Sequence, residues 1–264
     1  MRFLFTPVVK NLLIINIGIF FISNLLFSGL HLNDIFGLHS LYSQDFKAWQ
    51  FVSYMFMHAD FRHVFSNMFG LFVFGPMLEQ RWGTRRFLFF YFFTGVCAGF
   101  LYWGINMYQT AQLKQEVESF LAHPTPDAYS SILKKNEKRY YDMNIDEIDK
   151  YYYEPNNPVY IEQATSNVVT VYSNKVSFSM VGASGAIFGI LMAFALLFPN
   201  TEFYYFFLPI PIKAKYIVAF YGLYELYLEY TGNPDGIAHF AHLAGMFFGF
   251  ILVKYWQKQR NTFY

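Results

Sequence analysis

The chain has 264 residues, of which 55% are hydrophobic and only 14% are charged, whereas soluble domains carry about 25% charged residues. This deficit, together with 34 Phe and 22 Tyr, excludes a disordered chain and argues against a soluble enzyme. A net charge of +1 gives no support to nucleic-acid binding, and the single cysteine, Cys97, excludes a disulfide framework and a cysteine-based zinc site. The composition is that of a helical protein that crosses a membrane several times.

Six mostly apolar stretches approach the length of about 20 residues that a helix needs to cross a bilayer. They are approximately residues 11–30, 61–78, 87–107, 184–198, 214–230 and 237–256. The first has no cleavage site after it and is interpreted as an uncleaved anchor. The apolar segment 203–212 is interrupted by Pro209 and Pro211, so it is predicted to be an interfacial connection. The fold class predicted is an all-α membrane protein with a bundle of six transmembrane helices.

The distribution of basic residues predicts the orientation, because Lys and Arg in short loops favour the cytoplasmic side. A cytoplasmic N-terminus places most of them inside: Arg2, Lys10, Arg81, Arg85, Arg86, Lys213, Lys215, Lys254, Lys258 and Arg260. The short outer segments then hold only Lys47, with Arg62 at the start of the second helix. Both termini are therefore expected in the cytoplasm, and the arrangement suits a bacterial inner membrane.

Three parts are predicted along the chain. Residues 1–107 carry the first three helices and an outer loop at 31–60, residues 108–180 form a small soluble extracytoplasmic insertion, and residues 181–264 carry the last three helices and a cytoplasmic tail. The outer loop is apolar but interrupted by polar residues, as in a re-entrant element. Within the insertion, the stretches 112–121 and 127–139 are expected to be helical and 168–171 to be a strand.

Polar side chains inside membrane helices are costly and therefore indicate function. The second, fourth and sixth helices all enter from outside, and their first turns carry His63, Asn67, Ser184, His239 and His242. At a rise of about 1.5 Å per residue, all of them lie within roughly 10 Å of the outer boundary. A serine nucleophile, a histidine base and N–H donors for an oxyanion together favour a hydrolase.

The pattern leaves the acidic residues without a role. Asp60 and Asp235 lie at loop positions, so no acidic third member is predicted beside the serine and the histidine. Glu225 lies well inside the fifth helix and Glu229 nearer its outer end, and the sequence assigns neither a function.

The fourth and sixth helices each carry glycines four residues apart, Gly185 with Gly189 and Gly245 with Gly249. Small residues at this spacing let membrane helices approach closely. Close packing of these two helices would bring Ser184 beside His242, since His242 shares a face with the two later glycines.

Simpler interpretations of the same residues stand beside this one. Ser184 is also a good helix N-cap, His63 would be a buried histidine satisfied by a neighbour, and Asn67 would hold two helices together. The histidines would alternatively form a metal site, comprising His58, His63, His239 and His242. That site lacks a His-Glu-x-x-His run and a carboxylate at the same depth, so no metal is predicted, and His58 is expected to orient the outer loop through hydrogen bonds.

At these positions the sequence resembles the rhomboid family of intramembrane serine proteases. Four of its motifs appear in order: His-x4-His-x3-Asn at residues 58–67, Glu-x-Arg at 79–81, Gly-Ala-Ser-Gly at 182–185 and Ala-His-x-x-Gly at 241–245. The resemblance covers about 11–107 and 181–256, and it does not cover the insertion at 108–180.

The resemblance implies a role for each matching residue. Ser184 would be the nucleophile and His242 the general base, as a dyad without a carboxylate. His63, Asn67 and the Ser184 N–H would form the oxyanion hole, within a nucleophile motif that begins at Gly182. His239 would be a neighbour of the base, because only the register on His242 has the glycine three residues later.

The remaining implications concern the surroundings of that site. Phe188 stands four residues after the serine, where some members have Tyr, and its ring is expected to stack on His242. Residues 31–60 would be the family's membrane-embedded loop, and Glu79 and Arg81 would brace the cytoplasmic side. The substrates would be transmembrane segments of other proteins, cleaved within the lipid bilayer near the outer face, without a cofactor.

Two other functions remain open from the sequence. The first is a non-catalytic rhomboid-like protein that binds membrane clients; such relatives commonly lose the serine or the histidine, and this chain has both. The second is a channel or metal transporter that uses the histidines. Neither alternative accounts for both the Gly-Ala-Ser-Gly and the Ala-His-x-x-Gly motifs.

Overall fold

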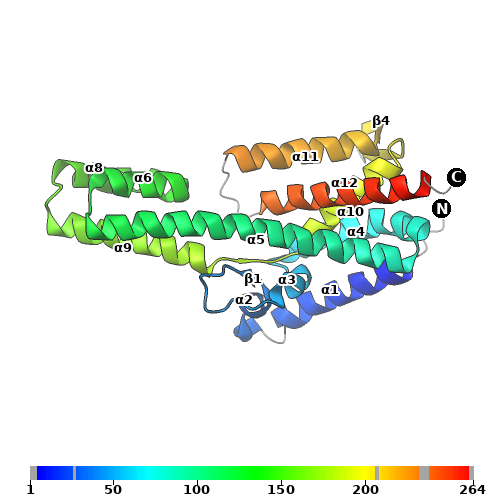
Figure 1. Ribbon diagram of the computed structural model, residues 1–264, viewed down its shortest axis with the longest axis horizontal. Helices are drawn as coiled ribbons and strands as arrows, with labels where there is room; N and C mark the ends of the chain where they lie inside the picture. Colours follow the sequence, from blue (N-terminus) through cyan, green and yellow to red (C-terminus); the bar gives the residue numbers. More distant parts are fainter. Residues whose placement is uncertain (1–4, 26–27, 206–207, 232–237, 262–264) are drawn as a thin grey trace. The chain divides into compact units, whose positions relative to one another are not determined.

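The computed structural model describes residues 5–25, 28–205, 208–231 and 238–261, and most of them are helical (Figure 1). The α-helices are α1 (Pro7–Leu25), α2 (Leu32–Phe36), α3 (Gln50–Ser53), α4 (Phe61–Trp82), α5 (Thr84–Ala122), α6 (Pro126–Asn136), α7 (Lys138–Met143), α8 (Ile145–Tyr153), α9 (Pro158–Ser177), α10 (Ser184–Leu197), α11 (Ala214–Thr231) and α12 (His239–Asn261). The 3₁₀ helices are η1 (Ser28–Leu30) and η2 (Tyr54–Phe56). The strands are β1 (Leu38–His39), β2 (Ser179–Met180), β3 (Glu202–Tyr205) and β4 (Leu208–Lys213), and they form two sheets of two strands each.

A helix lies at each of the six predicted membrane stretches: α1, α4, α5, α10, α11 and α12. Among the described residues, α1 and α5 are the two helices that are long and apolar enough to cross a membrane on length and composition alone. The helix α10 is apolar but has only 14 residues. The all-α class is therefore correct, whereas helix length and composition do not establish a count of six spans.

The apolar connection at 203–212 is a β-hairpin. Strand β3 pairs antiparallel with β4, with Glu202 opposite Lys213 and Phe203 opposite Ile212. Proline lacks the N–H that an inner strand would need, but both strands of a two-stranded hairpin are edge strands. Pro209 and Pro211 are therefore compatible with β4, and the segment connects α10 to α11 without being a helix.

The chain divides into two compact units. The first comprises residues 1–38, 47–102 and 179–264, and the second comprises residues 39–46 and 103–178. In the first unit, α10 contacts α4, α11 and α12, and α1 packs on α4. The central helix α10 is nearly all apolar, as expected for a helix surrounded by others.

The second unit has an apolar core of its own. The core side chains are Leu113, Val117, Phe120, Tyr129, Ile132, Leu133, Ile148, Tyr151, Ala164, Val168 and Val171. They come from the end of α5 and from α6, α8 and α9. The predicted strand at 168–171 is wrong, because these residues belong to α9. The buried positions Ala164, Val168 and Val171 follow the spacing of one helical face.

The carboxylate of Glu79 caps the N-terminus of α1. It accepts hydrogen bonds from the backbone N–H groups of Val8 and Val9, both at 3.0 Å, and from the Thr84 hydroxyl at 3.2 Å. The first N–H groups of a helix have no partners within the helix, and a carboxylate there also suits the helix dipole. Glu79 thereby joins α1 to the turn between α4 and α5, and Arg81 stacks on the ring of Phe198.

Candidate active site

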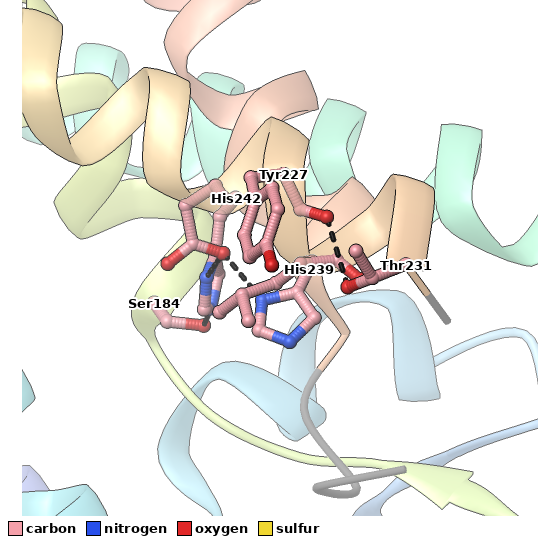
Figure 2. Close-up of polar contacts among 7 residues, drawn as sticks. Ser184, Tyr227, Thr231, His239 and His242 are labelled. Carbon is pink, nitrogen blue, oxygen red and sulfur yellow. Dashed lines mark hydrogen bonds and ion pairs between the residues drawn. The ribbon is translucent and has the colours of Figure 1, made fainter. Parts of the chain in front are cut away.

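Ser184 is the first residue of α10 and contacts α12 through its side chain. The N-cap of α10 is Ala183, so the interpretation of Ser184 as an N-cap is wrong. Its hydroxyl lies 2.8 Å from Nε2 of His242, which belongs to the first turn of α12 (Figure 2). A serine oxygen and an imidazole nitrogen at this distance have the geometry of a nucleophile and its general base.

Glycines allow this close approach of α10 and α12. A Cβ atom at Gly245 would overlap the carbonyl oxygen of Gly185, and one at Gly249 would lie 2.9 Å from the carbonyl oxygen of Gly189. The two backbones are therefore in direct contact at two successive turns. The packing predicted from the glycine spacing is confirmed, and it brings Ser184 to His242.

The ring of Phe188 packs against one face of the His242 imidazole. The two rings are stacked, with centroids 4.2 Å apart and an angle of 7° between their planes. Phe188 is one helical turn after Ser184, so both side chains project from α10 toward the same imidazole. The predicted stacking is confirmed, and a phenyl ring is sufficient for it.

A carboxylate lies beside the serine and the histidine, contrary to the sequence-based expectation. Oε2 of Glu225, on α11, lies 2.9 Å from Nδ1 of His242 and 2.6 Å from Nδ1 of His239. All three side chains are buried. The expectation that no acidic group accompanies the serine and the histidine is therefore wrong. The available signal was a glutamate inside an apolar helix, but its partners lie on another helix and could not be identified from spacing.

Polar groups of α4 lie beside the loop that precedes Ser184. Gly182 has a φ of 123°, and a Cβ there would lie 2.5 Å from Nε2 of His63 and 3.8 Å from Nδ2 of Asn67. Only glycine adopts this backbone without strain, and only glycine leaves room for the imidazole. Its N–H donates to the carbonyl of Tyr54 at 2.9 Å, which fixes the loop.

His63 and Asn67 each present an N–H donor at this position. Nδ1 of His63 accepts from the N–H of Ala59 at 3.4 Å, so its Nε2 carries the proton and is a donor near Gly182. Nδ2 of Asn67 is buried and has no hydrogen-bond partner among the described residues. Because an unpaired buried donor is costly, it indicates a site where an acceptor binds.

His58 has a different role from the one expected. Its two ring nitrogens have no hydrogen-bond partner among the described residues, and its ring packs edge-on against His63 with centroids 5.0 Å apart. Burial and the neighbouring His63 lower the pKa of the His58 imidazole to about 3, so the ring is neutral. The bond to the outer loop is made by its backbone carbonyl, which accepts from Nδ2 of Asn33.

The same residues include a possible set of metal ligands. One ligand atom each from Glu225, His239 and His242 lies within 4.8 Å of the others. Two nitrogen ligands and one carboxylate are a donor set that suits Zn²⁺. The two separations between Glu225 and the histidines, however, are hydrogen-bond distances from imidazole N–H to carboxylate. These hydrogen bonds use the same atoms that would bind the metal.

A model of a known protein family matches two stretches of the chain. The family model described as "Rhomboid domain" matches residues 45–117 and 159–258. The stretch 118–158, inside the predicted insertion, is outside the match and is shorter than the predicted boundaries of 108–180.

Two curated proteins are similar to parts of the chain. Rhomboid-like protein 11, chloroplastic, of Arabidopsis thaliana is 36% identical over 94 residues, which are 35% of this chain and 31% of that protein. An uncharacterized mitochondrial rhomboid protein of Schizosaccharomyces pombe is 37% identical over 87 residues, which are 30% of this chain and 22% of that protein. The chain thus matches less than one third of the length of either relative.

Proposed function

The chain belongs to the rhomboid family, and on this premise we propose that it is an intramembrane serine endopeptidase. Its substrates are transmembrane segments of other membrane proteins, which it cleaves near the outer face of the bilayer. The observation that carries the proposal is the distance of 2.8 Å between the Ser184 hydroxyl and Nε2 of His242. A protein that only binds membrane clients has no need for this pair.

The proposed reaction begins with proton transfer within the pair. His242 takes the hydroxyl proton as Ser184 attacks the carbonyl carbon of the scissile peptide bond, and a tetrahedral intermediate forms. The protonated imidazole then gives its proton to the leaving amine, and the acyl-enzyme remains on Ser184. A water molecule, deprotonated by the same histidine, hydrolyses the acyl-enzyme and restores the serine.

The negative oxygen of the intermediate needs donors that are already in place. Nε2 of His63 and Nδ2 of Asn67 flank Gly182, two residues before the nucleophile. The backbone N–H of Ser184 is a third donor, because it belongs to the first turn of α10, where N–H groups lack helical partners. The unpaired amide of Asn67 supports this assignment.

The placement in the membrane is also part of the proposal. We assign six spans to α1, α4, α5, α10, α11 and α12, with both termini on the cytoplasmic side. Apolar side chains exposed on several of these helices support contact with lipid, as for Phe100 on α5 and Phe220 on α11. The relatives bear chloroplastic and mitochondrial names, so they give no support to the expected bacterial inner membrane, and the proposal names a membrane without naming its compartment.

The substrate must expose a peptide bond to the serine. A transmembrane helix hides its carbonyl groups in internal hydrogen bonds, so the segment has to unwind locally before attack. We therefore expect cleavage near helix-breaking residues such as glycine and proline, which lower the cost of unwinding.

The experiment is cleavage of a transmembrane reporter by the purified protein in bilayers. Ser184→Ala removes the nucleophile and is expected to abolish cleavage, while its thermal unfolding midpoint stays that of the unmodified protein. Ser166→Ala, at an exposed position of α9, is the matched control and is expected to cleave normally. Normal cleavage by Ser184→Ala would refute the proposal, and binding of the reporter without turnover by the unmodified protein would favour a client-binding function.

A further inference from the structure

We infer that Glu225 is a positioning residue for the catalytic histidine, so that the site operates as a Ser184–His242–Glu225 triad in which His239 holds the carboxylate. The inference rests on the proposed serine protease function and adds to it a third helix, α11. It departs from the dyad without a carboxylate that the sequence motifs imply.

The contacts of Glu225 select the tautomer of His242. An ionised carboxylate only accepts hydrogen bonds, so the contact of 2.9 Å places the proton of His242 on Nδ1. Nε2 then presents its lone pair to the hydroxyl of Ser184 at 2.8 Å. This is the tautomer that a general base requires, since the other one would direct an N–H at the hydroxyl.

The carboxylate is also suited to the charged state of the reaction. When His242 takes the serine proton, both of its ring nitrogens carry protons and the ring is positive. Glu225 faces that ring from a buried position, where a negative charge stabilises an imidazolium more strongly than it would in water. The stacked ring of Phe188 keeps the imidazole in the plane that both hydrogen bonds need.

His239 provides the second support for Glu225. Its Nδ1 lies 2.6 Å from the same oxygen, Oε2, that contacts His242 (Figure 2). A buried carboxylate with a single neutral partner would pay a large desolvation cost, and two N–H donors reduce that cost. His239, three residues before the base on α12, thus holds the Glu225 carboxylate in the position that orients His242.

The test is the steady-state kinetics of Glu225→Gln on the reporter peptide bond. The amide keeps the shape of the side chain, but it removes the charge and its NH₂ group stabilises the wrong tautomer of His242. We expect kcat to fall by about 100-fold or more with KM within about twofold, because the defect concerns the base and not substrate binding. Glu225→Asp keeps the charge on a shorter side chain and is expected to recover part of that loss.

Glu229→Gln is the matched control, since it removes the same charge from an exposed position one turn further along α11. It is expected to leave kcat unchanged. A purely structural role would lower the unfolding midpoint and impair kcat and KM together, and that result would overturn the inference. Glu225→Gln with kcat within about threefold of the unmodified protein would overturn it as well. Loss of activity in EDTA with recovery on adding Zn²⁺ would also overturn it, since the donors would then hold a metal. Because Ser184→Ala is assayed in parallel, failure of the triad is distinguished from failure of the serine mechanism.

Discussion

The amide of Asn67 is the residue-scale feature that most needs an explanation. A buried N–H group without a partner costs free energy, and a fold keeps such a group where a ligand supplies the acceptor. Asn67 and His63 share a face of α4 because they are four residues apart, and both lie beside Gly182. An oxyanion that forms at Ser184 would supply the missing acceptor.

Replacement of Asn67 by alanine therefore has a specific expected effect. Asn67→Ala is expected to lower kcat by about 10- to 1000-fold with little change in KM, since the lost bond forms in the transition state. The thermal midpoint should not fall, because an unpaired group is removed. Asn24→Ala, on the exposed face of α1, is the control for loss of an amide. Full kcat in Asn67→Ala would exclude it from the oxyanion hole.

The sequence predicts some residues of this site and not others. Ser184 and His242 follow from helix spacing, because one face of α10 meets one face of α12, whereas Phe188 follows from the family resemblance and its place one turn after Ser184. Glu225 does not, because nothing local to α11 indicates which helix its side chain meets. Contacts between helices that are far apart in the chain depend on how each helix is rotated about its axis. When a helix is apolar on all sides, the periodicity of its apolar residues does not define that rotation.

At the scale of elements, the contact between α10 and α12 determines whether the pair forms. The glycines permit backbone contact, and any side chain at Gly245 would force the helices apart at the level of the serine. A shift of about 1 Å between a nucleophile and its base is enough to lower the rate substantially.

Gly245→Ala is accordingly expected to lower the unfolding midpoint and the activity together. Overpacking of this kind costs about 1–3 kcal/mol. The control is Gly18→Ala on α1, where an added Cβ would meet no atom within 4 Å and where alanine favours the helix. Thermal unfolding in detergent and reporter cleavage measure both effects. A Gly245→Ala protein as stable and active as Gly18→Ala would contradict this packing of α10 against α12.

Element boundaries illustrate where local patterns mislead. The apolar stretch at 87–107 is part of α5, which continues to Ala122 because the following polar residues are good helix formers. The β-branched residues at 168–171 favour a strand, yet their burial follows a helical period once they pack within the second unit. Tertiary packing overrides the local preference in that case.

The whole molecule consists of two units with separate apolar cores. The family model matches residues on both sides of 118–158, so the central part of the second unit lies outside the family match. The buried residues of this unit lie on the end of α5 and on α6, α8 and α9, and they form an apolar core within the unit.

Leu133→Ala tests whether the second unit is energetically separate. Leu133 is fully buried in α6, and its truncation is expected to cost about 2–5 kcal/mol within this unit. We expect faster proteolytic cleavage between residues 118 and 158, with reporter cleavage at the normal rate. Ser131→Ala, exposed on the same helix, should change neither. Equal loss of activity and of protease resistance in Leu133→Ala would show that the units depend on each other.

The central claim is that the hydroxyl of Ser184 is made nucleophilic by His242. A fluorophosphonate probe measures this directly, because it forms a covalent bond with an activated serine without requiring a natural substrate. We expect a probe adduct on the peptide that contains Ser184 in the unmodified protein, and no adduct in Ser184→Ala or in His242→Ala. An unlabelled native protein, or equal labelling of all three proteins, would contradict it.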